Sequence, residues 1–181
     1  DFNSYTSFVT SLPHRNIILD RSVGQYYEIK ANTQIKKLQG NHTYLGLNDY
    51  YIKLYYNQLE LYTNEGKLIQ QLQLPKTKTP FGPITRIGKN EFILCNKSNC
   101  LSVQIRHQQF HLKSIPKPIW ADNPTYYTGA QTWVRTSLDE LTPLDTNLAL
   151  IPEQQIQLTE NPITSLFIDK HGGRWIGTNG N

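Results

Sequence analysis

Four short stretches of the sequence each begin with an aromatic residue that apolar or small residues follow: Tyr51-Ile52-Lys53-Leu54, Phe92-Ile93-Leu94-Cys95, Trp133-Val134-Arg135-Thr136 and Trp175-Ile176-Gly177-Thr178. The leading aromatic residues recur at a nearly constant spacing of about 40 residues. Two further segments that resemble each other, 83–87 and 162–166, are separated by close to two such periods. The chain therefore contains an internal repeat of this length.

The residues around the first of these stretches predict three strands joined by tight turns. The runs 50–56, 59–63 and 67–74 are separated by Asn57-Gln58 and by Asn64-Glu65-Gly66, which are typical turn residues. No segment of helical length holds a helical period, so we expect essentially no α-helix. Short strands in a period of about 40 residues are typical of β-propeller blades, which bury both sheet faces against neighbours. The alternative is an antiparallel sandwich whose strand spacing only resembles a repeat.

We therefore expect an all-β fold, namely a fragment of a β-propeller in one partial domain. The expected four-stranded antiparallel blades are residues 7–39, 43–74, 84–114 and 125–158, and residues 163–178 supply two strands of a fifth. Tyr51, Phe92, Trp133 and Trp175 should occupy equivalent places on successive blades. The blades should form an open arc with exposed apolar faces at its ends, including Phe8 or Val9 at one end and Trp175 or Ile176 at the other.

The composition excludes several other classes of protein. The net charge is only +4, and the densest basic pair is Lys36-Lys37, so the basic stripe of a nucleic-acid-binding protein is missing. No apolar run approaches the length that spans a bilayer, so we expect no direct membrane contact. The sequence has no Met, which predicts a processed chain or a piece of a longer one.

The two cysteines lie close together in the sequence. Cys95 and Cys100 flank Asn96-Lys97-Ser98-Asn99, a run of turn residues. Residues that flank a short hairpin loop face each other across the strands, within reach of a disulfide. Two unrelated thiols are the alternative. The five His are scattered, and nothing pairs them with the cysteines, so we expect no metal site and no cofactor.

A segment between the expected third and fourth blades is the candidate ligand-binding site. It carries three aromatic residues next to carboxylate and amide groups, and its candidate contact residues are Trp120, Asp122, Tyr126 and Tyr127. Aromatic rings beside polar groups suit sugar stacking or a protein interface. The alternative is that these rings only pack between blades.

The segment 163–180 resembles the two-component regulator propeller repeat, whose pattern is an apolar strand followed by Asp-x-x-Gly-x-x-Trp-Ile-Gly-Thr. The matching residues are Asp169, Gly172, Trp175, Ile176, Gly177 and Thr178, and Arg174 departs from the usual aliphatic residue. The residues themselves indicate structural roles: Asp169 caps the turn, Gly172 takes a positive φ and Trp175 fills the gap between blades, while Gly177 admits a close neighbour. The sialidase Asp-box is excluded, because it needs Gly two residues after Asp, not three.

The resemblance implies a periplasmic sensor domain of a membrane-anchored bacterial histidine kinase or diguanylate cyclase. It implies a glycan or another small ligand, further blades in the parent chain, and a possible homodimer through the parent. No catalysis is expected in this segment. The alternatives are a carbohydrate-binding or scaffold propeller without a signalling role, and a propeller lyase or glycosidase. The acidic residues lie mostly at turns, where Asp is more often a cap than a catalyst.

Overall fold

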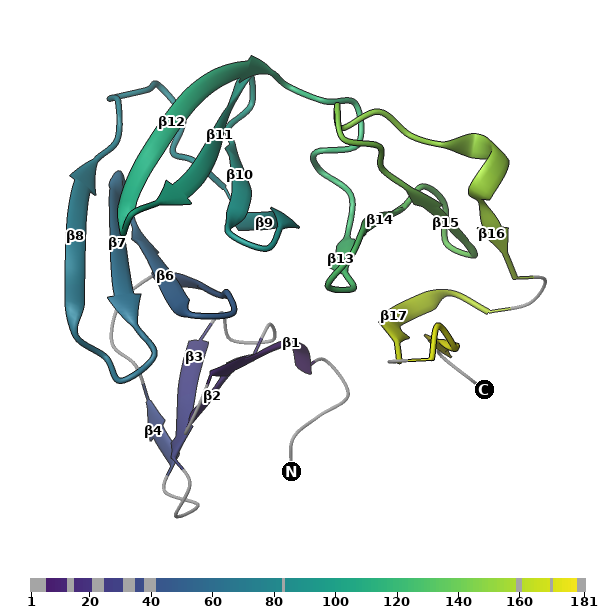
Figure 1. Ribbon diagram of the computed structural model, residues 1–181, viewed down its shortest axis with the longest axis horizontal. Helices are drawn as coiled ribbons and strands as arrows, with labels where there is room; N and C mark the ends of the chain where they lie inside the picture. The colour runs from purple at the N-terminus through teal and green to yellow at the C-terminus, as the bar shows by residue number, and fades with distance from the viewer. Residues whose placement is uncertain are drawn as a thin grey trace. The chain divides into compact units, whose positions relative to one another are not determined.

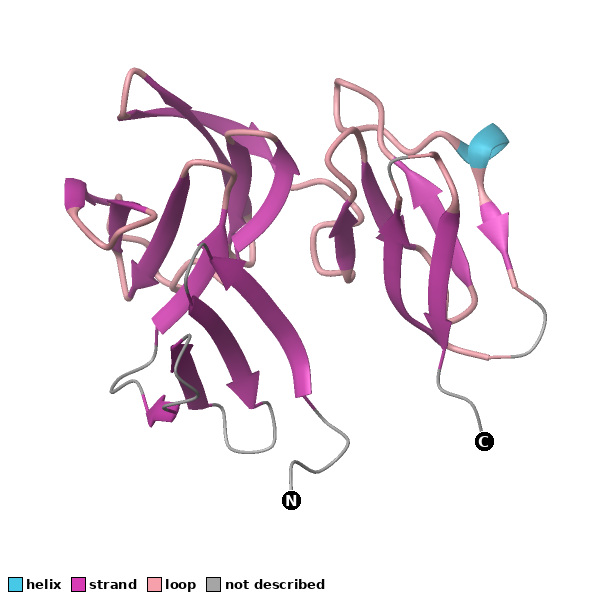
Figure 2. Ribbon diagram, turned by 60° about the horizontal axis from the view of Figure 1, so that its bottom comes forward, coloured by secondary structure: helices cyan, strands magenta, loops and turns pink. Residues whose placement is uncertain are grey.

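The computed structural model describes residues 6–12, 15–20, 25–30, 35–37, 42–82, 84–158, 161–169 and 171–178. The described chain consists of β-strands joined by turns and loops (Figure 2). Its one described helix is a single 3-10 turn, Pro152–Gln154. Side chains are described from Thr43 onward, so the first four strands are known as backbone only.

The described strands form five separate sheets, and Figure 1 labels most of these strands. The first two sheets consist of β1 (Thr6–Leu12), β2 (Arg15–Asp20), β3 (Gln25–Lys30) and β4 (Ile35–Lys37), and of β5 (His42–Gly46), β6 (Tyr50–Tyr55), β7 (Gln58–Thr63) and β8 (Leu68–Gln73). The third consists of β9 (Ile84–Gly88), β10 (Glu91–Cys95), β11 (Asn99–Arg106) and β12 (Gln109–Pro116). The fourth and fifth consist of β13 (Thr125–Tyr127), β14 (Thr132–Arg135), β15 (Glu140–Pro143) and β16 (Ile156–Gln157), and of β17 (Ile163–Ile168) and β18 (Arg174–Thr178).

Every sheet is antiparallel, and within each sheet strands that follow one another in sequence are neighbours. The all-β prediction of four four-stranded sheets and one two-stranded sheet is confirmed. The described chain divides into two compact units, Asp1–Ile84 with Gln104–Leu112, and Thr85–Val103 with Lys113–Asn181. The strands of the third sheet are shared between the units, and each unit is described below by itself.

In the first unit, the second sheet buries side chains on both of its faces. Ile52, Leu59 and Leu61 are fully buried on one face. On the other face Tyr51 and Tyr62 are register partners, and their rings stack with centroids 4.7 Å apart. Burial of both faces is the property that distinguishes a stacked blade from a sheet with one solvated face.

A buried carboxylate organises the aromatic face of this sheet. Glu60 accepts hydrogen bonds from the Tyr62 hydroxyl at 2.7 Å and from the Gln58 and Gln71 side-chain amides at 2.9 and 3.3 Å. Lys53, its register partner on β6, places Nζ 3.2 Å from Oε2. Burial raises the pKa of Glu60, but the hydrogen bonds from Tyr62, Gln58 and Lys53 and the Lys53 charge outweigh it, so the pKa lies below its usual range. Burial and the bond to Glu60 raise the pKa of the Tyr62 hydroxyl.

The second unit contains two apolar clusters, each built between consecutive sheets. In the first cluster Ile93 of the third sheet packs with Val134 and Leu144 of the fourth-sheet region, and with Trp120. In the second cluster Trp133 and Leu141 of the fourth sheet pack with Ile163, Leu166, Ile168 and Ile176 of the fifth. In these contacts, consecutive sheets pack face to face, as a repeat of stacked sheets requires.

The predicted equivalence of Tyr51 and Trp133 is wrong. In the hairpin β5–β6, Leu47 N donates to Tyr50 O, and two pairs further along Leu45 lies opposite Ile52. In the hairpin β13–β14, Thr128 N donates to Gln131 O, and two pairs further along Tyr126 lies opposite Trp133. Trp133 therefore corresponds to Ile52, not to Tyr51.

The third sheet shows the same one-residue offset, because Ile93, not Phe92, packs against the fourth sheet. The regular spacing in the sequence suggested that the leading aromatic residues are equivalent. The strand register, however, is set by the hairpin turns, and it differs from this alignment by one residue. Since side chains alternate between faces, a shift of one residue moves a side chain to the opposite face of its sheet. Trp133 and Trp175 do correspond, since Tyr126 and Phe167 are their register partners.

The exposure predicted for the fifth sheet is present at Trp175, whose side chain is 65% exposed, and at its partner Phe167, which is 63% exposed. Ile176 lies on the other face, where it packs against the fourth sheet. The exposure predicted for Phe8 or Val9 concerns side chains outside the described part of the structure.

Candidate ligand-binding sites

The segment that connects β12 to β13 holds Trp120 in the core. Its ring is only 2% exposed and belongs to the cluster formed by Ile93, Val134 and Leu144. The indole Nε1 donates a 2.8 Å hydrogen bond to the carbonyl of Leu148. A ring that is buried and hydrogen-bonded in this way offers no face to a ligand, so Trp120 is removed from the predicted contact residues.

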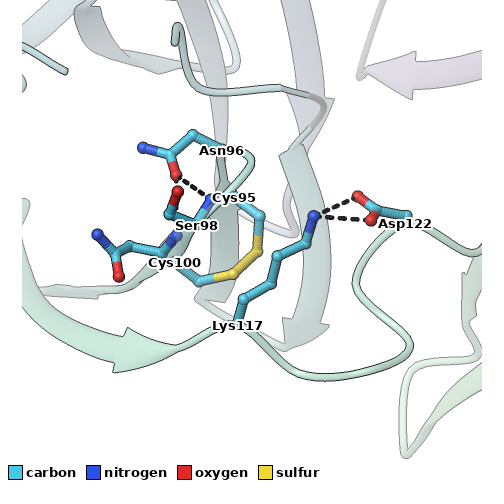
Figure 3. Close-up of polar contacts among 7 residues, drawn as sticks. Cys95, Asn96, Ser98, Cys100, Lys117 and Asp122 are labelled. Atoms are coloured by element: carbon cyan, nitrogen blue, oxygen red, sulfur yellow. Dashed lines mark hydrogen bonds and ion pairs between the residues drawn. A yellow bond between two sulfur atoms is a disulfide. The ribbon is translucent and has the colours of Figure 1, made fainter. Parts of the chain in front are cut away.

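Asp122 lies at the surface of the same segment. Both of its carboxylate oxygens accept hydrogen bonds from Lys117 Nζ, at 2.7 and 2.8 Å (Figure 3). Two backbone bonds, from Ala121 N to Pro118 O and from Asn123 N to Trp120 O, turn the chain between these two residues. The ion pair thus spans the turn that carries Trp120, and because Asp122 is exposed it contributes little to stability.

The two tyrosines of the segment lie on β13 and differ in their surroundings. Tyr126 packs against the Trp133 cluster. The Tyr127 hydroxyl donates to Gly129 O at 2.7 Å, and the Arg86 guanidinium lies 4.2 Å from the centre of its ring. Arg86 Nε also donates to Gly88 O at 3.0 Å, and burial lowers the pKa of Arg86 although Tyr127 opposes this shift. Such packing holds the third and fourth sheets together.

The predicted ligand-binding segment is therefore mainly a connection between sheets. Of its four predicted contact residues, Trp120 and Tyr126 pack in apolar clusters. Asp122 and Tyr127 keep solvent-accessible surface but are engaged by Lys117 and Arg86. The alternative given in the sequence analysis, that these rings only pack between blades, accounts for the observed contacts.

Cys95 and Cys100 are joined by a disulfide, and their Cα atoms are 4.1 Å apart. They belong to the hairpin β10–β11, where Asn96 N donates to Asn99 O. The buried Asn96 Oδ1 accepts from Ser98 N at 2.9 Å and from Asn99 N at 2.8 Å, which is an Asx-turn. The turn residues read from the sequence thus bring the cysteines opposite each other.

Replacing Cys95 and Cys100 together with alanine is expected to lower the free energy of unfolding by about 2 kcal/mol, because a short bridged loop restricts the unfolded chain only modestly. Denaturant unfolding with and without a thiol reductant measures this effect. The double variant should not respond to the reductant, whereas the parent chain should lose about the same 2 kcal/mol. A parent chain whose stability is unchanged by full reduction would contradict the prediction.

The family-like motif forms a closed turn between β17 and β18. Asp169 Oδ1 accepts from His171 N at 2.8 Å and Gly173 N at 2.9 Å, and Oδ2 accepts from Trp175 Nε1 at 3.0 Å. These bonds, led by that from Trp175, lower the pKa of the Asp169 carboxyl. Gly172 has a φ of 83°, and a Cβ on Gly177 would collide with Ser165 Oγ. The predicted structural roles of Asp169, Gly172 and Gly177 are confirmed.

Sequence reasoning missed an exposed aromatic pair, Tyr55–Tyr56, at the turn between β6 and β7. The Tyr56 side chain is 66% exposed and that of Tyr55 36% exposed. Their rings meet edge to face with centroids 4.5 Å apart. The Gln73 side chain and Leu74 N both donate to Asn57 O, at 2.9 and 2.7 Å. These two hydrogen bonds hold the backbone of the turn that follows the pair.

Tyr56 also has an unfavourable backbone conformation. Its φ is 50°, in the left-handed region that favours Gly, Asn or Asp and costs a bulky residue about 1 kcal/mol or more. An exposed ring recovers little of this cost through burial, and such outliers concentrate at functional sites. The signal available in the sequence was a tyrosine where a two-residue hairpin turn usually has Gly or Asn.

Among the residues that the structure describes, no group of three or more His, Cys, Asp and Glu side chains is arranged to hold a metal ion. No helix of the described chain is long and apolar enough to cross a membrane.

No protein-family model and no curated protein sequence matches the chain. Solved structures do match it. An inactive H270A variant of virginiamycin B lyase from Staphylococcus aureus aligns with a TM-score of 0.57, 11% identity, and coverage of 94% of this chain and 62% of that one. The β-propeller domain of Cps50 (Swd1) from Myceliophteria thermophila aligns with a TM-score of 0.53, 15% identity, and coverage of 96% and 62%.

Glutaminyl cyclase from Myxococcus xanthus also aligns, with a TM-score of 0.52, 9% identity, and coverage of 98% of this chain and 87% of that one. The chain thus spans 62% of the length of the lyase and Swd1 chains. At these identities the likeness concerns the fold alone. Together with the five antiparallel sheets and the packing between consecutive ones, it shows that the chain has a β-propeller fold.

Proposed function

We propose that this chain is the ligand-binding part of an extracytoplasmic sensor propeller, within a membrane-anchored bacterial histidine kinase or diguanylate cyclase. The resemblance of the last repeat to the two-component regulator propeller pattern supports this proposal. Its Asp, Gly and Trp residues form one closed turn in which Asp169 accepts three hydrogen bonds. The segment binds its ligand and does not catalyse a reaction of it.

The disulfide supports a location outside the cytoplasm. The chain has two cysteines, and both are used in the Cys95–Cys100 bridge. Structural disulfides persist in oxidising compartments such as the bacterial periplasm and are rare in the cytosol. A periplasmic domain of a membrane-anchored protein meets this condition.

The observation that carries the binding function is the Tyr55–Tyr56 pair. Its rings present apolar surface beside a turn whose backbone is held by hydrogen bonds from Gln73 and Leu74. Amide side chains accompany the pair: Asn57 and Gln58 follow it in the hairpin, and the exposed Gln73 on β8 is the register partner of Gln58. Flat rings beside amide groups suit a ligand with apolar C–H faces and many hydroxyls. A neutral glycan has this chemistry.

Replacing Tyr56 with asparagine is expected to abolish binding to immobilised neutral oligosaccharides while leaving stability within about 1 kcal/mol of the parent chain, because asparagine tolerates a positive φ. A glycan array and a thermal unfolding curve measure the two effects. A ring with a purely structural role would instead lower stability and leave binding unchanged.

The matched control is Gln108→Asn. Gln108 is also exposed, has a φ of 62° and lies in the turn between β11 and β12, but it carries no ring. Binding by this variant should equal that of the parent chain. Equal losses in both variants would show that backbone change at any such turn disturbs the chain, and would remove the role of Tyr56.

The alternative propeller functions have separate tests. A carbohydrate-binding or scaffold propeller without signalling would bind the same array, but its gene would encode no transmembrane helix with a kinase or cyclase module. A lyase or glycosidase would release new products from bound glycans. Incubating the chain with oligosaccharides and analysing the mixture by mass spectrometry decides this point, and unchanged substrate is the expected result.

A further inference from the structure

The second sheet has an open edge at β8, its last strand (Figure 1). In the described part of the chain no strand pairs with β8 on the side away from β7. Leu74 N donates to Asn57 O, and Gln73 is the register partner of Gln58. Because hydrogen-bonded and non-hydrogen-bonded pairs alternate in an antiparallel ladder, the backbone N–H and C=O groups of Gln71 and Gln73 point outward, away from β7.

The last strands of the other three four-stranded sheets are protected against pairing, as edge strands usually are. β4 has three residues, of which two are lysines, and β16 has two residues. β12 carries an exposed His111 and an exposed Lys113, and it ends at Pro116. The segment 70–74, which includes the end of β8, contains neither a charged residue nor a proline. The edge of the second sheet thus lacks the protection that the other three have.

The segment 70–74 is also complementary to itself. It lies between Ile69, which the β7–β8 register skips, and Pro75. When two copies of the segment pair antiparallel about Leu72, Gln71 of each copy faces Gln73 of the other, and Leu72 faces its own equivalent. An amide side chain both donates and accepts hydrogen bonds, so the glutamines suit one another. The pairing therefore sets amide against amide and aliphatic side chain against aliphatic side chain.

Charge favours a second copy over a charged partner strand. The cations nearest to the segment are Lys67 and Lys76, and both are exposed. In the register centred on Leu72, Lys67 faces Thr77 and Lys76 faces Leu68, so no like charges meet. A strongly charged strand would find no opposite charge in the uncharged segment. Each chain offers one such edge, so pairing between identical edges closes at two copies.

We propose that β8 is a homodimer interface, at which two copies of the chain join their second sheets into one continuous antiparallel sheet. Gln71 of each copy exchanges backbone hydrogen bonds with Gln73 of the other on both sides of the two-fold axis. The described chain forms this contact by itself and needs no other part of a longer protein. The contact is made by backbone groups of β8, so it does not depend on the ligand proposed for Tyr55 and Tyr56.

Cross-linking tests the register of the two strands. In a non-hydrogen-bonded antiparallel pair the Cα atoms lie about 4.5 Å apart, which is within the range of a disulfide. Cys95 and Cys100 are already bonded to each other, so Leu72→Cys adds one free thiol. With oxidised glutathione as the oxidant, this variant is expected to form a covalent dimer joined through position 72. Non-reducing electrophoresis and peptide mapping measure this product.

Leu68→Cys is the matched control for cross-linking. Leu68 lies on the same strand, and its side chain is 45% exposed, whereas Leu72 is half-buried. In the proposed register Leu68 faces Lys76 of the other copy and lies far from its own equivalent. This variant should stay monomeric on the same gel although its thiol is more accessible. Equal cross-linking of the two variants, or none at position 72, overturns the proposal.

Proline at the edge tests the backbone hydrogen bonds. Gln71→Pro removes an outward N–H and no bond to β7, so light scattering should give the mass of two chains for the parent and of one chain for this variant. Gln71→Ala loses the same side chain, with its bond to Glu60, but keeps the N–H and should remain dimeric. Circular dichroism checks that each variant keeps its strands, and cross-linking at position 72 decides the case where Gln71→Pro loses them. A monomeric parent, open-ended oligomers, or a folded Gln71→Pro dimer overturns the proposal.

Discussion

Replacing Trp133 with alanine is expected to lower the free energy of unfolding by about 3–5 kcal/mol. The ring is fully buried between the fourth and fifth sheets, where it contacts the cluster that contains Leu141 and Ile163. Its removal loses the transfer free energy of a large aromatic side chain and leaves a cavity that the two sheets cannot fill. Urea unfolding followed by circular dichroism measures the loss.

Trp175→Ala is the matched control, because Trp175 has the equivalent place on the fifth sheet but is exposed. Its expected cost is about 1 kcal/mol or less, from the lost hydrogen bond to Asp169. The contrast between two tryptophans of the same repeat position isolates the effect of the covering sheet. Similar losses in the two variants would contradict the packing described for Trp133.

Glu60→Gln is expected to lower the free energy of unfolding by about 1–3 kcal/mol at neutral pH. The amide keeps the shape of the carboxylate but cannot accept at both oxygens, and it leaves Lys53 without its negative partner. The hydrogen bonds from Tyr62, Gln58 and Gln71 converge on the two oxygens, so one of these donors meets an amide N–H. Thermal and denaturant unfolding measure the loss.

The cost of this substitution should depend on pH. The pKa of Glu60 is lower in the folded chain than its ordinary value of 4.5. A lowered pKa means that the carboxylate stabilises the fold fully above the ordinary value, and that this stabilisation disappears as the pH falls through the folded pKa. The difference between the parent chain and Glu60→Gln should therefore shrink as the pH falls below about 4.5.

Glu153→Gln is the control for this pH dependence, since Glu153 is exposed in the 3-10 turn. Its stability should follow the parent chain within about 0.5 kcal/mol at every pH. A Glu60→Gln variant with the same deficit in acid as at neutral pH would show that the carboxylate charge is not what stabilises the second sheet.

Much of the fold could be predicted from the sequence because its causes are local. Asn57 and Gly66 mark the ends of strands at their own positions, and the period of about 40 residues records how often a sheet is completed. The hairpin that joins Cys95 to Cys100 needs only the turn chemistry of Asn96. The cap made by Asp169 likewise involves residues within a few positions of it.

The tertiary structure alone decided which side chains are available to a ligand. In the sequence, Trp120 appeared available to stack on a ligand. In the structure, Ile93 of the third sheet and Val134 of the fourth sheet enclose it. Tyr56 looked like one more strand residue, and only the turn geometry gives it an exposed ring with a positive φ. Burial depends on residues that are distant in the chain, which spacing along one strand does not record.

The alignment of the repeats shows the same limit at the level of single residues. The regular spacing placed Tyr51 and Trp133 at equivalent positions, but the hairpin registers match Trp133 with Ile52. The sequence by itself determined the strands, the turns and the number of sheets, because these follow from local chemistry and a regular period. The tertiary structure decided which face of each sheet a residue occupies, because a one-residue shift in pairing exchanges the two faces.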